Sequence, residues 1–440
     1  MILPLSFRRR FPEIALTGLV LAGLGHTLNR FLVDGRLPQP FIFDVWDTFM
    51  DWFNTAYWAH NPGAFDVWRT VYPPLSFDFL RMFTTERCYR FDPLSARECD
   101  IYGIVSIIAW YVACVLIAAY AFHKRNAETA ALRAISFGFG LPLIFTLERG
   151  NLIIPCFVFF VLAHSDIAKS RWIRALSAAI SINFKPYLLL TVVSWALHRK
   201  WRLLELAGIA TVLVYFLSLA AFADGTLTQM VANTANWVSF TSGFAYEGIY
   251  YSTSFTPFLE FNTHRFPTRS FIDTRIVDLI ATGVPIITTA SLALGIVTMA
   301  AVWLQPDAVT RTRTSAVLLA FYLVQASPGG YTATFLVFLV FMEPWRRPGP
   351  IIAIVMAYLL CVPYDYVLTN FLRLSGDRSW LSGRQVSTDF GIGVGMFARP
   401  GMIVILFWAL ALDTLMQVRR AHRHLKPVLA LRPLSPRQAG

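Results

Sequence analysis

The chain alternates apolar segments with short clusters of basic residues, and this alternation constrains its fold more than any other feature. About twelve apolar segments can be placed, and several are shorter than the ~20 helical residues that cross a typical bilayer. They lie at about 13–33, 101–122, 134–147, 152–163, 175–184, 186–197, 203–223, 277–303, 315–326, 332–343, 350–368 and 401–418. The basic clusters between them are Arg8–Arg10, His123–Arg125, Lys169–Arg174, Arg199–Arg202, Arg311 with Arg313, Arg346–Arg347 and Arg419–Lys426. If every cluster is cytoplasmic, the chain crosses roughly twelve times with both termini inside.

The composition agrees with a polytopic all-α membrane protein. Of the 440 residues 56% are hydrophobic and only 15% are charged, far more apolar than a soluble domain. The formal net charge of +12 could indicate nucleic acid binding, but the positive-inside rule accounts for it, so we expect no nucleic acid partner. The apolar run from Ile14 to Val33 is long enough to span and has no small-residue cleavage site after it, which favours an uncleaved first helix.

This topology predicts a single integral membrane domain over residues 1–425, followed by a basic cytoplasmic tail at 426–440 that we expect to be disordered. Three large loops, 34–100, 224–276 and 369–400, would lie on the outer side. The short apolar segments pair into hairpins bent near the outer surface, with tips at 148–151, 183–186 and 327–330. Broken helices of this kind are tolerated where their backbone faces protein or a water-filled cavity.

The five cysteines fall into two groups. Cys114, Cys156 and Cys361 lie within apolar segments and are expected to be buried packing residues. Cys88 and Cys99 lie in the first large loop, where they could form a disulfide if the loop faces an oxidising compartment. Two free thiols are the alternative, and the spacing does not decide between them.

Three aspartates near the start of the first loop are candidate catalytic residues. Asp44, Asp47 and Asp51 have the spacing i, i+3 and i+7, so a helix here would place them on one face. The aromatic residues around them are typical of a helix lying in a membrane interface. A carboxylate desolvated by such neighbours has a raised pKa, which suits a general base that takes a proton from a sugar hydroxyl.

Two basic residues break the positive-inside pattern. Arg149 and Lys185 stand at hairpin tips on the predicted outer side, where a pair of cations suits a phosphate or diphosphate. Interfacial snorkelling, or pairing of Arg149 with Glu148, would explain them equally simply. Among the loop aromatics, Tyr57 and Tyr72 could stack on a sugar, although such residues also form the ordinary interfacial belt.

Other kinds of site receive little support. His264, in the second large loop, could contact substrate, but a lone histidine is more often structural. Asp44 and Asp47 lack the accompanying ligands of a metal site. Neither a glycine-rich phosphate loop nor a Ser/His/Asp set is recognisable, so a reaction here would use an activated group delivered by the membrane.

Four short motifs occur in order along the first half of the chain: DWFNTAYWA at 51–59, YPP at 72–74, RGN at 149–151 and FKP at 184–186. Together they resemble motifs of the polyprenyl-phosphate-sugar-dependent glycosyltransferases of family 87, in the C-type superfamily. The resemblance covers the first 200 residues by motif and the whole chain by topology. Thr55 departs from the family, which often has Tyr there. The resemblance implies the C-type architecture, with Asp51 as the base and Asp47 and Asp44 in reserve.

The resemblance also implies a reaction at the outer face of a bacterial inner membrane. The donor would be a sugar on a polyprenyl monophosphate and the acceptor a glycolipid or glycan, with inversion at the anomeric carbon. Asp51 would take the acceptor proton, Arg149 and Lys185 would bind the donor phosphate, and Asn151, Tyr72, Tyr57 and His264 would contact substrate. Because cations alone can stabilise a departing monophosphate, we expect no metal and no other cofactor, and we expect a monomer.

Two alternatives stay open. A polysaccharide polymerase or ligase would use diphosphate-linked lipids and rely on an outer Arg or His, leaving Asp51 dispensable. A lipid or glycan transporter would place charges near the bilayer midplane and show inverted repeats, of which the sequence gives little sign.

Overall fold

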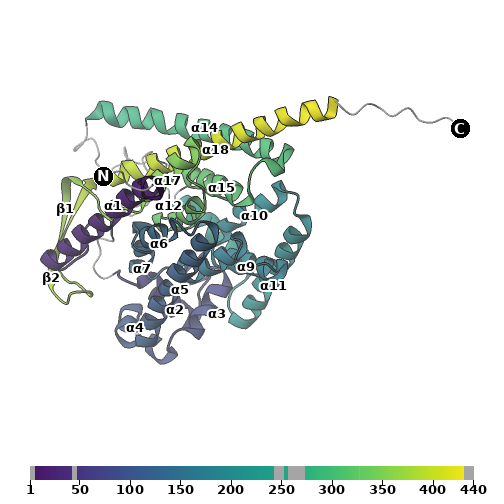
Figure 1. Ribbon diagram of the computed structural model, residues 1–440. Helices are drawn as coiled ribbons and strands as arrows, with labels where there is room; N and C mark the ends of the chain where they lie inside the picture. The colour runs from purple at the N-terminus through teal and green to yellow at the C-terminus, as the bar shows by residue number, and fades with distance from the viewer. Residues whose placement is uncertain (1–4, 42–46, 242–251, 256–272, 327, 431–440) are drawn as a thin grey trace.

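The structure, a computed structural model, describes residues 5–41, 47–241, 252–255, 273–326 and 328–430, most of them in helices (Figure 1). The elements in chain order are α1 Leu5–Asp34, α2 Met50–His60, α3 Pro74–Met82, η1 Glu86–Tyr89, α4 Pro93–Cys99, α5 Ile101–Arg125, α6 Ala130–Gly138, α7 Leu141–Arg149, α8 Ile153–His164, α9 Arg171–Phe184, η2 Pro186–Leu188, α10 Leu189–Leu197, α11 Trp201–Phe222, α12 Leu227–Thr241, α14 Thr274–Leu304, η5 Pro306–Ala308, α15 Arg311–Gln325, η6 Gly330–Thr332, α16 Ala333–Phe341, α17 Pro348–Leu360, β1 Val367–Arg378, β2 Gln385–Gly393 and α18 Val394–Ala430.

The helices are those of a membrane protein. Among the described residues, 6 helical stretches are long and apolar enough to cross a bilayer. They are Arg10–Asp34, Ile101–Arg125, Ala130–Arg149, Trp201–Phe222, Thr274–Leu304 and Val394–Arg423. Four shorter apolar helices, Ile153–His164, Pro186–Leu197, Gly330–Phe341 and Pro348–Leu360, accompany them. The predicted count of about twelve crossings needs the shorter helices to cross in pairs and stays a prediction.

Burial separates a central helix from peripheral ones. Every residue of α16 is buried, as expected of a helix that is apolar on all sides. In α11 and α14, by contrast, only 22% of the most apolar window is buried, so most of their apolar surface faces outward, where lipid would cover it. A large cluster of buried aromatic and aliphatic residues around α8, α16 and α17 forms the core.

A buried ion pair fastens α1 to the rest of the body. The Arg133 guanidinium of α6 donates from Nε to Glu13 Oε2 at 2.9 Å and from Nη2 to Glu13 Oε1 at 2.7 Å. The Tyr358 hydroxyl of α17 donates to the same Glu13 at 2.8 Å. Because a buried charge is tolerated only when it is paired and hydrogen-bonded, this arrangement explains why two charges can sit inside the helical body.

The third large loop, predicted at 369–400, contains an antiparallel β-hairpin that the sequence analysis did not predict. Strands β1 and β2 pair from Val367 opposite Gly393 to Arg378 opposite Gln385, with several irregularities in register. The turn between them uses Gly383 at φ +69°, a conformation that favours glycine. The sequence does contain a hairpin pattern here, namely two runs rich in β-forming residues separated by a turn that contains Gly, but the segment was predicted only as a loop.

Two helix boundaries also differ from expectation. The segment 134–147 is broken between α6 and α7 at Gly140, where an added Cβ would lie 2.8 Å from Cys361 Sγ, and Pro142 then opens the new helix. At the other end of the chain α18 runs from Val394 through Ala430, so residues 426–430 of the predicted disordered tail are helical. The helix continues past Pro427, a residue that is unfavourable inside a helix, so local helix propensity does not explain this extension.

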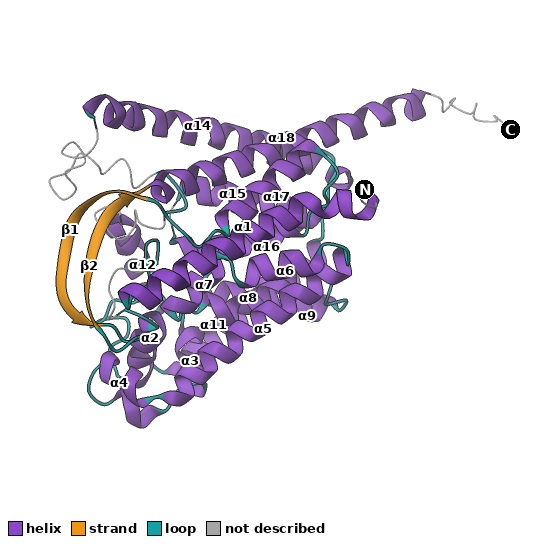
Figure 2. Ribbon diagram, turned by 60° about the vertical axis from the view of Figure 1, so that its left-hand side comes forward, coloured by secondary structure: helices purple, strands orange, loops and turns teal. Residues whose placement is uncertain are grey.

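The three large loops meet at one end of the helical body. Figure 2 shows β1–β2, α12, α2 and α4 gathered there, with the N-terminus at the opposite side. The Arg36 Nε of the first loop donates to Ser387 O at 2.9 Å, and Asn233 Nδ2 of α12 donates to Phe65 O at 2.8 Å. These contacts make the three loops parts of one structural layer.

Candidate functional site

The helix that carries Asp51 begins later than the three-aspartate pattern requires. Helix α2 starts at Met50, because Phe49 adopts a left-handed conformation with φ 65° and its N–H donates to Glu148 O at 2.7 Å. Asp47 therefore precedes the helix, and the expected face of aspartates at i, i+3 and i+7 is wrong for Asp47 and Asp51. Asp44 lies outside the described residues.

In the described part of this segment the aromatic side chains face the protein interior, so α2 does not present the lipid-facing side expected of an interfacial helix. Trp52 and Phe53 of α2 are 0% exposed, and Met50, Ala56 and Ala59 are buried as well. The ring of Phe49 packs edge-on against Trp380 from the turn of the β-hairpin, with ring centroids 5.4 Å apart. The aromatic residues thus fix α2 within protein, and the rigid packing positions the side chain of Asp51.

Asp51 contacts two residues of the turn that follows α7. Asn151 donates from Nδ2 to Asp51 Oδ2 at 2.6 Å, and Arg149 forms an ion pair with Asp51 and another with Asp47. The Asn151 side chain is fully buried, and its Oδ1 accepts the N–H of Ile153 at 3.0 Å, so the first turn of α8 holds it in place. The structure therefore brings together Asp51, Asp47, Arg149 and Asn151, which the sequence analysis had named separately.

Gly150 allows this close approach. Its φ is +63°, and an added Cβ would lie 3.0 Å from both the Cα and the carbonyl oxygen of Phe49 and 3.1 Å from Trp52 Cβ. The RGN turn thus needs glycine both for its backbone conformation and for its contact with α2. The short RGN motif therefore has a definite structural reason.

Lys185 lies in the turn between α9 and η2, with its ammonium over two tyrosine rings. Its Nζ is 4.6 Å from the centroid of Tyr72 and 5.7 Å from that of Tyr331. In the part of the chain that the structure describes, no carboxylate lies within ion-pair distance of it. Burial lowers the pKa of Lys185 to about 8, and the negative charge of Asp51 opposes this shift.

Tyr72 connects the lysine to the aspartate. Burial raises the pKa of its hydroxyl well above the ordinary value, and the negative charge of Asp51 raises it further, while hydrogen bonding with Thr55 and Asn151 acts in the opposite direction. The hydroxyl therefore stays protonated at neutral pH. These contacts join seven residues into one group, which we call the Asp51 cluster. It consists of Asp47, Asp51, Tyr72, Arg149, Asn151, Lys185 and Tyr331.

Tyr331 is a residue of the cluster that was not predicted from the sequence. It follows the third hairpin tip, in η6, and its ring faces Lys185. Its position in the sequence could have indicated a role, because the third hairpin tip is expected on the same side of the membrane as the two tips that carry Arg149 and Lys185. Tyr57, by contrast, packs edge-on against Trp68, with ring centroids 5.7 Å apart. His264 lies outside the described residues.

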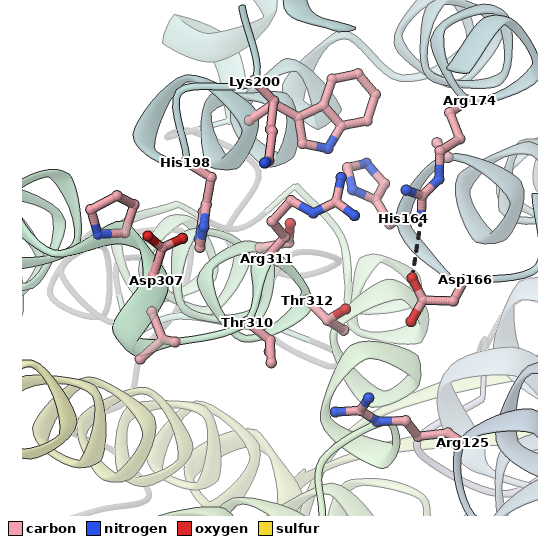
Figure 3. Close-up of a pocket in the computed structure, with 15 residues that line it drawn as sticks. Arg125, His164, Asp166, Arg174, His198, Lys200, Asp307, Thr310, Arg311 and Thr312 are labelled. Atoms are coloured by element: carbon pink, nitrogen blue, oxygen red, sulfur yellow. Dashed lines mark hydrogen bonds and ion pairs between the residues drawn. The ribbon is translucent and has the colours of Figure 1, made fainter. Parts of the chain in front are cut away.

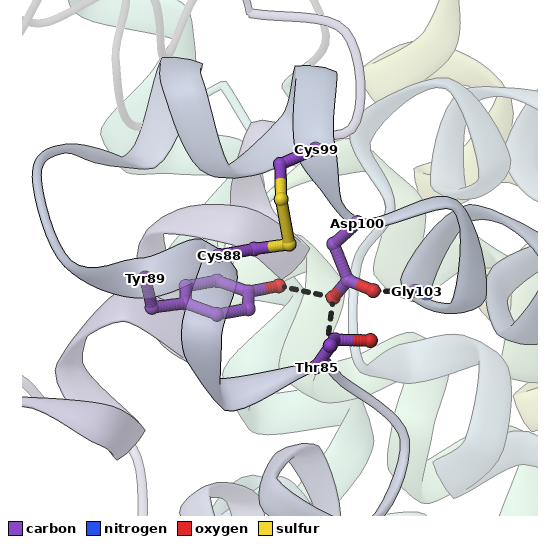
Figure 4. The surroundings of a disulfide bond; sticks show 6 residues. All are labelled: Thr85, Cys88, Tyr89, Cys99, Asp100 and Gly103. Carbon is purple, nitrogen blue, oxygen red and sulfur yellow. Dashed lines mark hydrogen bonds between the residues drawn. A yellow bond between two sulfur atoms is a disulfide. The ribbon is translucent and has the colours of Figure 1, made fainter.

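Cys88 and Cys99 form a disulfide that joins η1 to α4 (Figure 4). The next residue, Asp100, accepts the Tyr89 hydroxyl at 2.9 Å and the N–H groups of Thr85 and Gly103 at 3.1 and 3.0 Å. Its carboxylate therefore caps α5 and ties the disulfide loop to it. The three remaining cysteines are free and buried, as expected.

No group of three or more His, Cys, Asp and Glu side chains that could hold a metal occurs among the residues described. Comparison of the chain with family models, with curated proteins and with solved structures finds no match. The functional interpretation therefore depends on the motifs and on the geometry of the Asp51 cluster.

Proposed function

We propose that the protein is a membrane glycosyltransferase that moves a sugar from a polyprenyl-phosphate donor to a glycolipid or glycan acceptor at the outer face of a bacterial inner membrane. The observation that carries the proposal is the convergence of four distant segments on one cluster. They supply a fixed carboxylate at Asp51, a buried amide at Asn151, a cation at Lys185 and a protonated hydroxyl at Tyr72.

Asp51 has the properties of a positioned base. Arg149 beside it favours the ionised carboxylate, and Asn151 fixes its orientation. In the proposed reaction the acceptor hydroxyl gives its proton to Asp51 as its oxygen bonds to the anomeric carbon. The bond from that carbon to the donor phosphate oxygen breaks on the opposite face, and the electron pair leaves with the phosphate, so the configuration inverts.

Arg149 and Lys185 have different roles in this proposal, which the sequence did not indicate. Arg149 is engaged with Asp47 and Asp51, so we assign it to positioning the carboxylates rather than to gripping the donor alone. Lys185, held over the Tyr72 ring, is the better candidate for neutralising the departing phosphate. The formal charges of Asp47 and Asp51 balance those of Arg149 and Lys185, so binding of the donor phosphate would depend on its direct contacts with the Lys185 ammonium and the tyrosine hydroxyls rather than on a net positive charge.

The disulfide supports an outer location for the cluster. Disulfides persist in oxidising compartments, and Cys88 and Cys99 lie in the same loop as Asp51. A donor displayed on the outer leaflet would meet the cluster there. This argument is independent of the charge pattern that first indicated the topology.

The experiment that tests the class supplies purified protein in nanodiscs with radiolabelled sugars on polyprenyl monophosphate or polyprenyl diphosphate, plus a lipid extract as acceptor source. We expect label to move to a new product from a monophosphate-linked donor only. Turnover from diphosphate-linked donors alone would favour the polymerase or ligase, and movement of unaltered lipid in proteoliposomes without chemistry would favour a transporter.

A further inference from the structure

A polar cavity lies where α8, α10 and α15 approach one another, away from the Asp51 cluster. Its volume is about 340 Å³, within the range of small-molecule sites. His164 ends α8, His198 follows α10, and Thr310, Arg311 and Thr312 open α15, and Figure 3 shows their side chains around the open space. The cavity thus collects polar groups from the ends of three helices.

The lining is strongly basic. Four cationic side chains face two carboxylates, which leaves a formal charge of +2 with both histidines neutral. They are Arg125, Arg174, Lys200 and Arg311 against Asp166 and Asp307. Asp166 is already partly used, since Arg174 Nη2 lies 3.4 Å from its Oδ1. The surplus of positive charge would favour an anion in the cavity.

Arg311 is the cation with the most capacity for a ligand. The described part of the chain gives it no ion-pair partner, whereas Arg313, two residues on, donates to Glu343 at 2.8 Å and to Asp413 at 2.7 Å. Arg311 is also the first residue of α15, where the helix dipole favours an anion. Burial and the charge of Arg311 lower the pKa of His198, which lines the same cavity.

The cavity lies far from the Asp51 cluster. Helix α9 has Arg174 in its first turn and Lys185 just after its end, and eleven residues of helix span about 16 Å. Helix α8 likewise begins beside Asn151 and ends at His164. The two sites are therefore at opposite ends of the same helices, and a ligand in one does not contact the other.

We propose that this cavity is a second site, which binds the phosphate group of an anionic ligand through Arg311, Lys200 and the N-terminus of α15. The guanidinium can donate two parallel hydrogen bonds to phosphate oxygens, and Lys200 adds a point charge. The phosphate could belong to a lipid headgroup in the adjoining leaflet or to a soluble phosphate compound. The proposal does not depend on glycosyltransferase activity.

The test measures binding to the full chain in two arms. In the first, inorganic pyrophosphate is titrated into protein in phosphatidylcholine nanodiscs. In the second, fluorescent phosphatidylglycerol is incorporated into the nanodiscs without soluble phosphate. Arg311→Gln should weaken binding by about 10- to 100-fold, since a charged hydrogen bond is worth roughly 1.5–3 kcal/mol. Arg202→Gln, an equal charge change at an exposed residue outside the cavity, is the control and should change binding by less than about twofold.

Binding of pyrophosphate that depends on Arg311 identifies a soluble phosphate compound as the ligand. Binding of phosphatidylglycerol that depends on Arg311 identifies a lipid headgroup. Lys200→Gln, at an exposed position, keeps the test valid if Arg311→Gln does not fold, and it should also weaken binding. Absence of binding in both arms overturns the proposal. Equal weakening by Arg311→Gln and Arg202→Gln overturns it as well, because the effect would then be one of overall charge.

Discussion

Lys185 is the residue of the Asp51 cluster whose charge should change most readily with pH. Because burial lowers its pKa to about 8, the ammonium that would meet the donor phosphate is lost as pH rises through about 8. We predict that affinity for polyprenyl phosphate falls by up to about tenfold per pH unit above that value. Binding measured in nanodiscs between about pH 6.5 and 9.5 checks this.

Lys185→Arg is the matched control for that prediction, since a guanidinium stays protonated throughout this range. Its affinity should not change with pH, and an identical fall in affinity in both proteins would refute the role of Lys185.

The stability of the wild-type protein should show the opposite trend with pH. The unfolded chain, with a lysine pKa near 10.5, binds more protons than the folded protein between about pH 8 and 10.5, so folding becomes more favourable as pH rises through that window.

Single residues were predictable where a motif carried them. Asp51, Tyr72, Asn151 and Lys185 were named from short motifs, and the structure places them in one cluster. The ion pair of Arg149 with Asp47 was not predictable, because it requires the left-handed turn at Phe49, a conformation that non-glycine residues rarely adopt.

The turn at 149–151 is the element that sets the position of Asp51, and Gly150 is its most sensitive residue. We predict that Gly150→Ala destabilises the protein by more than the ~1–2 kcal/mol expected for a left-handed alanine, because its Cβ also presses on the Phe49 backbone. The displaced turn should weaken the Asn151–Asp51 bond and lower transfer activity. Thermal unfolding and turnover are the two measurements.

Gly383 supplies the control for the turn. Its φ is +69°, but an added Cβ would come no closer than 3.7 Å to another atom, so Gly383→Ala has the same backbone strain without the collision. It should cost only the strain and leave turnover near wild type. Equal losses of stability in the two variants would show that the contact with α2 does not matter.

Helices were the elements best predicted from sequence. All of the predicted apolar segments overlap helices, because a backbone in lipid must satisfy its own hydrogen bonds. The start of α2 and the β1–β2 hairpin were missed for a common reason. Both are fixed by contacts with distant residues, Phe49 with Glu148 and Arg36 with Ser387, which local patterns do not contain.

At the scale of the whole molecule, the same helices join the Asp51 cluster at one end to the basic cavity at the other. This arrangement predicts that the two ends face opposite sides of the membrane. We expect Asp66→Cys, in the same large loop as Asp51, to react with a membrane-impermeant maleimide in intact cells, and Glu128→Cys to react only after the membrane is opened. Both positions are exposed, and the native free cysteines are buried.

Labelling of both cysteines from the same side would contradict this topology. Labelling in the reverse order would place the Asp51 cluster in the cytoplasm, where the disulfide would be hard to maintain. The sides and the number of crossings both stay predictions. The number is hard to predict because the helices α8, α10, α16 and α17 are too short to cross singly, and their pairing depends on packing inside the body.

The most direct test of the account compares Asp51→Asn with Asp47→Asn in the transfer assay, with donor binding measured in parallel. Both variants remove one negative charge beside Arg149, but only Asp51 is held by Asn151 and proposed to take the proton. We predict that Asp51→Asn lowers turnover by about 10²- to 10⁴-fold while donor binding changes little, and that Asp47→Asn keeps most of its activity. Wild-type turnover in Asp51→Asn, or a larger loss in Asp47→Asn, would contradict the central claim that Asp51 is the catalytic base.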